Sequence, residues 1–209
     1  MAYLYEWLIL MSVFGLGLIS PGPDFVMAVR NSVTYSRKAG LFTALGFACG
    51  VCIHVIYAIV GVSVLISQSA FLFTAVKYIG GFYLFYIGVK AIRSKGYQRI
   101  VDVNSDIAGR EMSVRDALLS GFITNLFNPK ALLFFPALFT QVLSPDLPVS
   151  VQALFGVSCV LMTWGWFSLV AVFLTNQRFQ AVFMGFSQWI DRICGGLMIG
   201  LGVKLVLSK

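Results

Sequence analysis

The strongest constraint in this sequence is a series of long apolar segments with few charged residues. Each is at least about 20 residues long, which is enough for a helix to cross the ~30 Å hydrocarbon core of a bilayer. Of the 209 residues, 59% are apolar and 11% are charged, whereas a soluble domain carries about 25% charged residues. A chain this short has too much surface to hide so many apolar residues from water. The composition therefore excludes a soluble enzyme and a disordered chain, and it predicts an all-α integral membrane protein.

Charged and polar residues divide the chain into six predicted transmembrane helices. Their ranges are 4–29, 39–66, 70–92, 117–143, 149–174 and 188–207. The connections at 67–69 and 144–148 are short, so the helices that they join are expected to be antiparallel neighbours. The predicted layout is a first three-helix repeat at residues 1–92, a connecting loop at 93–116 and a second three-helix repeat at 117–209.

The distribution of Lys and Arg predicts the orientation of these helices. The net charge of +7 would suggest a nucleic-acid partner in a soluble protein, but in a membrane protein basic residues gather in cytoplasmic loops. They cluster after the first helix, around the central loop and before the sixth helix, at Arg30, Arg37, Lys38, Lys90, Arg93, Lys95, Arg99, Arg110, Arg115, Arg178 and Arg192. We therefore expect no nucleic-acid partner, a cytoplasmic central loop and both termini outside.

The third and sixth predicted helices share a glycine pattern. Gly81 is followed by Gly88-Val89-Lys90 at the same spacing at which Gly195 is followed by Gly202-Val203-Lys204. Each half has three helices, an odd number, so a second copy of the first half must enter the membrane upside down. The pattern favours two inverted repeats, an arrangement in which transporters place a binding site between the halves. Recurrence of small residues at helix interfaces by chance is the alternative.

The first predicted helix is interrupted by Ser20-Pro21-Gly22-Pro23-Asp24. Pro23 removes a backbone donor, and we expect Gly22 to add conformational freedom. A break of this kind is tolerated in a membrane only against protein or a wet cavity. Asp24 lies at the break, and a charge at bilayer depth costs about 2.5–3.5 kcal/mol on insertion scales, which makes it a candidate functional residue.

The fourth predicted helix is interrupted in a similar way at Asn128-Pro129-Lys130, with Asn125 one turn earlier. Matching interruptions in corresponding segments point to a transporter binding site. Lys130 could pair with a substrate carboxylate and Asp24 with its ammonium group, so a zwitterionic amino acid would suit the pair. Two structural alternatives remain: Asp24 caps the helix that restarts after Pro23, or Asp24 and Lys130 form an ion pair across the halves.

Other polar residues in the apolar segments have less specific predicted roles. His54 is a candidate for the proton pathway, since the unperturbed pKa of histidine is near 6.5, and a bond to a neighbouring helix is the alternative. Cys49 and Cys52 are expected to be buried small apolar residues, and no metal site is expected. Tyr83 and Tyr86 are expected to be packing or interface anchors, and Asp191 to form a local ion pair with Arg192.

Three of these segments together resemble a known family over essentially the whole chain. Ser20-Pro21-Gly22-Pro23-Asp24, residues 124–131 and Trp189-Ile190-Asp191 are similar to motifs of the LysE/RhtB amino-acid exporter family, and most similar to its threonine and homoserine efflux branch. The resemblance implies a multi-pass bacterial inner-membrane exporter of small neutral amino acids, driven by the proton gradient. It also implies functional roles for Pro21, Gly22, Pro23, Asp24, Asn128, Pro129 and Lys130.

The leading hypothesis is therefore a secondary transporter, not an enzyme, that exports small amino acids such as threonine or homoserine by proton antiport. Its expected partners are the amino acid, protons and the lipid bilayer, without a cofactor, and a homo-oligomer is compatible with the pattern. Export of leucine-like or basic amino acids is an alternative within the family. A heavy-metal exporter using Cys49, Cys52, His54 and Asp24, and a thiol oxidoreductase using the two cysteines, are alternatives from other classes.

Overall fold

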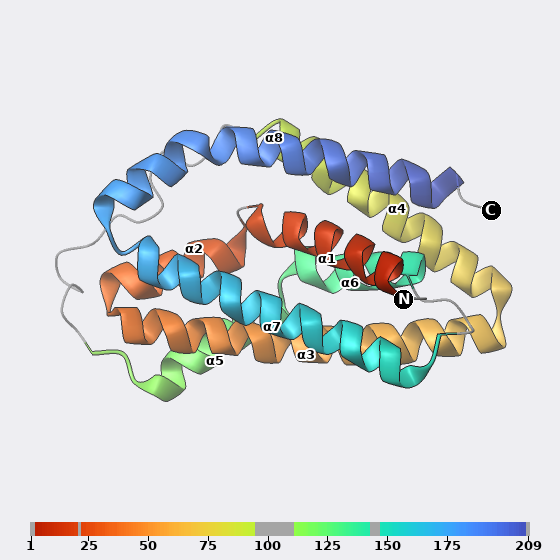
Figure 1. The fold of residues 1–209 in the computed structure, drawn as a ribbon, viewed down its shortest axis with the longest axis horizontal. Helices are drawn as coiled ribbons and strands as arrows, with labels where there is room; N and C mark the ends of the chain where they lie inside the picture. Colours follow the sequence, from red (N-terminus) through yellow and green to blue (C-terminus); the bar gives the residue numbers. More distant parts are fainter. Residues whose placement is uncertain (1–2, 21, 95–110, 143–146, 208–209) are drawn as a thin grey trace.

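A computed structural model describes residues 3–20, 22–94, 111–142 and 147–207. All regular secondary structure in these ranges is α-helical (Figure 1), which confirms the predicted fold class at this level. The eight helices are α1 (Leu4–Ile19), α2 (Pro23–Thr34), α3 (Arg37–Gln68), α4 (Ala70–Ile92), α5 (Val114–Leu126), α6 (Pro129–Val142), α7 (Val149–Phe173) and α8 (Gln177–Leu207). The predicted loop at 93–116 lies mostly outside the described residues.

Three helices are long and apolar enough to cross a bilayer, namely α3, α4 and α7. The pairs α1–α2 and α5–α6 qualify when each is taken as one broken span, which raises the number to five among the described residues. The predicted sixth span corresponds to α8. This helix is not among the five candidate spans, because Asp191, Arg192 and Lys204 interrupt its apolar stretch. The helix α8 also begins at Gln177, well before the predicted start at residue 188.

Both proline motifs break a helix in the structure. The axes of α1 and α2 meet at 57°, and those of α5 and α6 meet at 58°. Pro23 is the first residue of α2 and Pro129 is the first residue of α6. Proline is favoured at this position because its missing N–H would have no partner within the helix and its φ angle already suits a helix. Each proline therefore starts a new helix rather than bending a continuous one.

The outer surface of the molecule is apolar, as expected for a protein in lipid. Large apolar side chains are exposed on seven of the eight described helices, for example Phe71 on α4 at 79% and Phe127 after α5 at 74%. Monomeric soluble proteins rarely expose apolar patches of this extent. The inward-facing core contains a cluster of aromatic rings that includes Phe14 of α1 with Phe134, Phe135 and Phe139 of α6.

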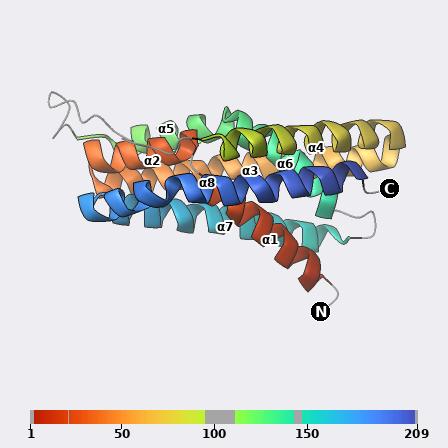
Figure 2. The same ribbon diagram turned by 90° about the horizontal axis from the view of Figure 1, so that it is seen from above.

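The helices α4 and α8 pack closely along two pairs of glycines (Figure 2). A Cβ atom added at Gly88 would lie 2.7 Å from the carbonyl oxygen of Gly195, and one added at Gly202 would lie 2.6 Å from that of Gly81. In the glycine pattern shared by α4 and α8, Gly81, the first glycine in α4, therefore contacts Gly202, the second in α8. Likewise Gly88, the second glycine in α4, contacts Gly195, the first in α8. This reciprocal contact requires the two helices to run antiparallel.

The helix α6 contains Pro136, whose ring cannot donate to the carbonyl oxygen of Leu132 one turn earlier. The hydroxyl of Tyr57 on α3 donates to this carbonyl oxygen. On the adjacent helix α4, the hydroxyl of Tyr83 donates to the carbonyl oxygen of Pro129 at 2.8 Å. Tyrosines of two neighbouring helices thus bind backbone acceptors of α6 and anchor it next to its break.

Removal of the Tyr57 hydroxyl is expected to destabilise the protein. Leu132 is on the outer surface, where it faces lipid or detergent rather than water. In Tyr57→Phe its carbonyl loses the substitute donor, and a polar group left unsatisfied away from water costs about 1–3 kcal/mol. The thermal midpoint in detergent, followed by size-exclusion chromatography, should fall below that of the wild type. Tyr5→Phe is the matched control, because Tyr5 is 71% exposed. Equal midpoints for the two variants would contradict the assigned role.

Candidate functional site

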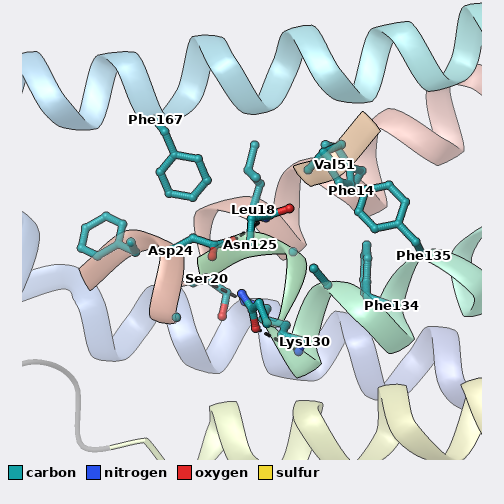
Figure 3. Close-up of a pocket in the computed structure, with 15 residues that line it drawn as sticks. Phe14, Leu18, Ser20, Asp24, Val51, Asn125, Lys130, Phe134, Phe135 and Phe167 are labelled. Carbon is teal, nitrogen blue, oxygen red and sulfur yellow. Dashed lines mark hydrogen bonds between the residues drawn. The ribbon is translucent and has the colours of Figure 1, made fainter. Parts of the chain in front are cut away.

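The two helix breaks meet in the interior, near the middle of the long axis of the molecule (Figures 1 and 3). Between them lies a cavity of about 50 Å³. Its polar lining comes from the breaks themselves, with Ser20, Gly22 and Asp24 from the first and Asn125, Asn128 and Lys130 from the second. The structure therefore brings six residues of the two motifs together at one site. Of the other predicted site residues, Pro23 and Pro129 border a larger cavity next to it, whereas Pro21 lies outside the described residues.

Asp24 lies in the first turn of α2 and is 9% exposed. One carboxylate oxygen, Oδ2, accepts a hydrogen bond of 2.8 Å from Nδ2 of Asn125. The other oxygen, Oδ1, is buried and has no hydrogen-bond partner among the described residues. The N-cap residue of α2 is Gly22, and no side-chain hydrogen bond caps the helix, so the capping alternative for Asp24 is wrong. A buried carboxylate oxygen that lacks a donor is an acceptor available to a ligand.

Lys130 extends from the first turn of α6 to the end of α1. Its ammonium nitrogen Nζ donates to the carbonyl oxygen of Ser20 at 2.8 Å, and Ser20 is the residue at which α1 terminates. A positive charge at a helix C-terminus interacts favourably with the helix dipole. Both Asp24 and Lys130 belong to the described part of the chain, and no ion pair joins them there. The predicted alternative of a direct ion pair is therefore not seen, although the two residues line the same cavity.

Gly22 lies beside Lys130 and does not use the conformational freedom of glycine. Its φ of −158° and ψ of −169° describe extended backbone that any residue adopts, which corrects the expectation drawn from the sequence. A Cβ atom at Gly22 would lie 3.9 Å from Nζ of Lys130 and 3.7 Å from its Cδ. The missing side chain thus leaves the space in front of the lysine ammonium group open.

Asn125 connects Asp24 to His54. The ring nitrogen Nε2 of His54 lies 3.0 Å from the backbone oxygen of Asn125, and the side chain of Asn125 binds Asp24. His54 is fully buried, is stacked on Phe135, and does not line the small cavity. The structure thus places His54 behind Asn125, where it holds the end of α5. Its other ring nitrogen, Nδ1, makes no hydrogen bond to the described part of the chain.

Asn128 caps the helix α6. Its side-chain oxygen Oδ1 accepts a hydrogen bond of 3.0 Å from the backbone N–H of Lys130. This is the usual interaction of an asparagine at a helix N-cap. The N-terminus of α2 has no such cap, because the corresponding residue is Gly22. Of the two helix N-termini at the site, the one at α2 therefore keeps donors free for an external acceptor.

The rest of the small cavity is apolar. Aromatic rings line it from four helices, and Figure 3 shows those of α1 and α6 on one side and that of α7 on another. These rings belong to Phe14, Phe25, Phe134, Phe135 and Phe167. The site thus combines two oppositely charged side chains, Asp24 and Lys130, with an apolar wall. Ligand-binding pockets commonly have a few polar groups in such a wall.

A larger cavity of about 990 Å³ lies on the other side of Lys130. Four residues line both cavities, namely Ser20, Gly22, Asn128 and Lys130. The larger cavity extends to Lys90 and Arg93 at the end of α4 and is also lined by Tyr83, Tyr86 and Asp191.

Sequence reasoning missed the position of Asp191 in this larger cavity. The side chain of Asp191 is 3% exposed, whereas Arg192 is exposed and lies with its guanidinium carbon 5.6 Å from the centre of the Trp189 ring. The two side chains therefore point in different directions, and the expected local pair does not form between them. The signal available in the sequence was the acid itself within an otherwise apolar segment.

The cysteines are not arranged as expected. Cys49 and Cys52 are both exposed on α3, so the prediction that they are buried is wrong. The reason is helical geometry: residues three apart share one face of the helix, and here this is the outward face. His54 is on the buried side of the same helix. Within the described ranges, no group of three or more His, Cys, Asp or Glu residues is placed to hold a metal ion.

Comparison with known proteins agrees with the resemblance seen in the motifs. A family model described as "LysE type translocator" matches residues 15–209. The threonine efflux protein of Escherichia coli K12 is 30% identical over 194 residues, which cover 92% of this chain and 93% of that protein. The threonine efflux protein of Salmonella typhi is 31% identical over the same shares of the two chains.

A third relative, an uncharacterised membrane protein of Bacillus subtilis, is 30% identical over 203 residues, covering 91% of this chain and 93% of that protein. No solved structure matches. The family match spans nearly the whole chain and includes both helix breaks and the residues of the site. The chain therefore belongs to the family of LysE type translocators.

Proposed function

We propose that this protein is a secondary transporter that exports small neutral amino acids of the threonine and homoserine type from the cytoplasm. The observation that carries the proposal is that one small cavity is lined both by Lys130 and by Asp24, whose buried oxygen Oδ1 has no hydrogen-bond partner among the described residues. Similarity to the threonine efflux proteins of two bacteria supports the choice of substrate class.

The acidic side of the cavity suits the ammonium group of an amino acid. Oδ1 of Asp24 and Oδ1 of Asn125 are both buried, and neither accepts a hydrogen bond from a described residue. An ammonium group carries three N–H donors and no acceptor. It would satisfy both oxygens, and its positive charge would compensate the buried carboxylate of Asp24.

The basic side of the cavity suits the carboxylate of the same molecule. Lys130 supplies an ammonium group beside Gly22, and the uncapped first turn of α2 supplies backbone N–H donors. A helix N-terminus carries a partial positive charge, so it binds carboxylates well. The contact of Lys130 with the carbonyl oxygen of Ser20 would be exchanged for a contact with the substrate. In this scheme Asn125, Asn128 and His54 position the charged groups.

The apolar wall disfavours a charged substrate side chain. Phenylalanine rings surround the space beyond the two charged groups, and an unpaired charge placed against them would lose its hydration. A small neutral side chain fits this surface, whereas the side chains of basic amino acids do not. The outward position of Cys49 and Cys52 likewise gives a metal ion few ligands at the site.

Binding requires the cavity to widen. A cavity of about 150 Å³ holds benzene, and the small cavity measures about 50 Å³. The proposed transporter widens it by alternating access, in which residues 1–92 and 117–209 form two inverted repeats that rock against each other. The reciprocal glycine contacts of α4 and α8 support this symmetry. So does the matching start of α2 and α6 at a proline.

Proton antiport completes the proposal. Asp24 would carry a proton inward when it is not bound to the substrate ammonium group, so that export is coupled to the proton gradient. In this proposal the protein spans the bacterial inner membrane and has both termini outside. The two termini lie toward the same end of the long axis in Figure 1, which supports the six crossings predicted from the sequence. Basic residues at the connections of the opposite end put that end in the cytoplasm.

The decisive experiment measures amino-acid transport by the purified protein in liposomes and compares Lys130→Gln with the wild type. Loss of the lysine charge removes the main partner of the substrate carboxylate, and a contact of this kind is worth about 2–4 kcal/mol, or about 30- to 1000-fold. Threonine and homoserine transport should fall by that factor. Lys38→Gln, at an exposed position, should transport like the wild type.

Threoninamide, which lacks the carboxylate, provides the matched substrate control. It should bind the wild type weakly, and Lys130→Gln should weaken its binding no further, because the contact is already absent. Equal losses of threonine and threoninamide binding would show that Lys130 does not act on the carboxylate. Transport of leucine or lysine in place of threonine would instead establish one of the alternative substrate classes.

A further inference from the structure

Asp191 on α8 is a second buried acid next to Lys130. The small cavity places Lys130 beside Asp24, and the large cavity places the same lysine beside Asp191. The carboxylate of Asp191 lies close to Ser20 and Ser94, and it interacts electrostatically with Lys130. One lysine is therefore flanked by two acids that belong to different cavities.

Lys130 is the movable part of the wall between the two cavities. Of the four residues that line both, Gly22 has no side chain, Asn128 is held by its capping bond, and Ser20 has a short side chain. Lys130 has a flexible four-carbon chain that is held at its tip by the carbonyl oxygen of Ser20. Exchange of this single contact would open a passage between the cavities.

The sizes of the cavities suggest the order in which they are used. At about 990 Å³ the large cavity is of the size of a small-molecule site, whereas the small cavity is too narrow for an amino acid without rearrangement. The large cavity also reaches two exposed cations, Lys90 and Arg93. Clefts lined by charge raise the local concentration of ions of opposite sign, here carboxylates.

We propose that the large cavity is a loading site for zwitterionic amino acids, in which Asp191 receives the ammonium group before it is passed to Asp24, and in which Lys130 is the gate. This inference rests on the proposed function and adds a second binding position to it. The substrate carboxylate stays with Lys130 throughout, while the ammonium group moves from one acid to the other. Lys130 is an electrostatic neighbour of both acids, so neither buried carboxylate is left without a nearby positive charge while the ammonium group moves.

Cysteine labelling in inverted membrane vesicles tests this proposal. The four native cysteines are replaced by serine, retained transport is verified, and Val89→Cys then reports on the large cavity, which Val89 lines. A membrane-impermeant thiol reagent labels it from the former cytoplasmic side. Saturating threonine should slow labelling at least about threefold. Glu111→Cys, exposed and outside both cavities, is the control and should be labelled equally with and without threonine.

Two further variants in this background separate the loading site from the inner site. Asp191→Asn should remove the protection of Val89→Cys and reduce transport at low threonine concentration at least about tenfold, and Asp191→Glu should restore part of both. Asp24→Asn should abolish transport yet keep the protection. Measurement of the protection of Val89→Cys in the Asp24→Asn variant tests the proposal even if Asp191→Asn does not fold.

The outcomes distinguish this proposal from the proposed function. Protection that is lost in Asp24→Asn, or kept in Asp191→Asn, would overturn the separate loading site. Absence of protection in a background that transports threonine would also overturn it, while the proposed function would stand. Failure of the wild type to transport any amino acid would refute the proposed function itself.

Discussion

Replacement of Asp24 by asparagine is expected to abolish amino-acid transport while leaving the fold intact. The asparagine keeps an oxygen that can accept the hydrogen bond from Asn125, so the local packing is preserved. The charge that binds the substrate ammonium group and carries the proton is lost. Loss of one partner of a buried charge pair costs about 3–5 kcal/mol, so the transport rate should fall at least about 100-fold. Asp24→Glu, which keeps the charge on a longer side chain, should recover part of the rate.

The measurement is threonine transport in liposomes, both driven by a proton gradient and in exchange without a gradient. Both modes should be lost, because Asp24 is proposed to bind substrate as well as protons. Glu111→Gln removes an acid at an exposed position away from the site and should match the wild type. Gradient-driven transport at the wild-type rate in Asp24→Asn would eliminate the assigned role. Loss of the gradient-driven mode alone would limit that role to the proton.

Replacement of Gly121 by alanine is expected to prevent the protein from folding stably. Gly121 on α5 faces the backbone of α3, and an added Cβ atom would collide with the carbonyl group of Thr43, 2.9 Å from its carbon and closer to its oxygen. The neighbouring Gly46 makes the reverse contact, with its missing Cβ against the backbone of Leu118 and Phe122. Small residues at such positions allow helices to approach closely, and backbone atoms cannot rotate away as side chains do.

The expected effect is a loss of several kcal/mol, at or above the upper end of the 1–3 kcal/mol range of overpacking substitutions. The yield of monodisperse protein in detergent and its thermal midpoint should both drop sharply. Gly165→Ala on α7 is the matched control, since a Cβ atom there would meet nothing within 4 Å. It should be neutral or slightly stabilising, because alanine favours helices over glycine by about 1 kcal/mol. Similar midpoints for the two variants would disprove the close α3–α5 contact.

Several features could be predicted from the sequence because their causes are local. An apolar segment of sufficient length indicates a membrane helix regardless of the residues around it. The helices predicted at 70–92 and 149–174 agree closely with α4 and α7. Proline lacks an N–H wherever it occurs, so the breaks at Pro23 and Pro129 were also predictable. The matching glycine spacing of α4 and α8 could be seen in the sequence, but the contact between the glycines of the two helices could not.

The tertiary structure alone decided which side chains meet. The partner of Asp24 is Asn125 rather than Lys130, and Asp191 faces the large cavity rather than Arg192. The exposure of Cys49 and Cys52 likewise depends on how α3 is rotated about its axis. In a chain that is apolar on nearly every helix face, hydrophobic patterning does not specify this rotation, because lipid and protein interior are equally apolar. Close packing between helices specifies it instead, and that packing becomes known only when all the helices are in place.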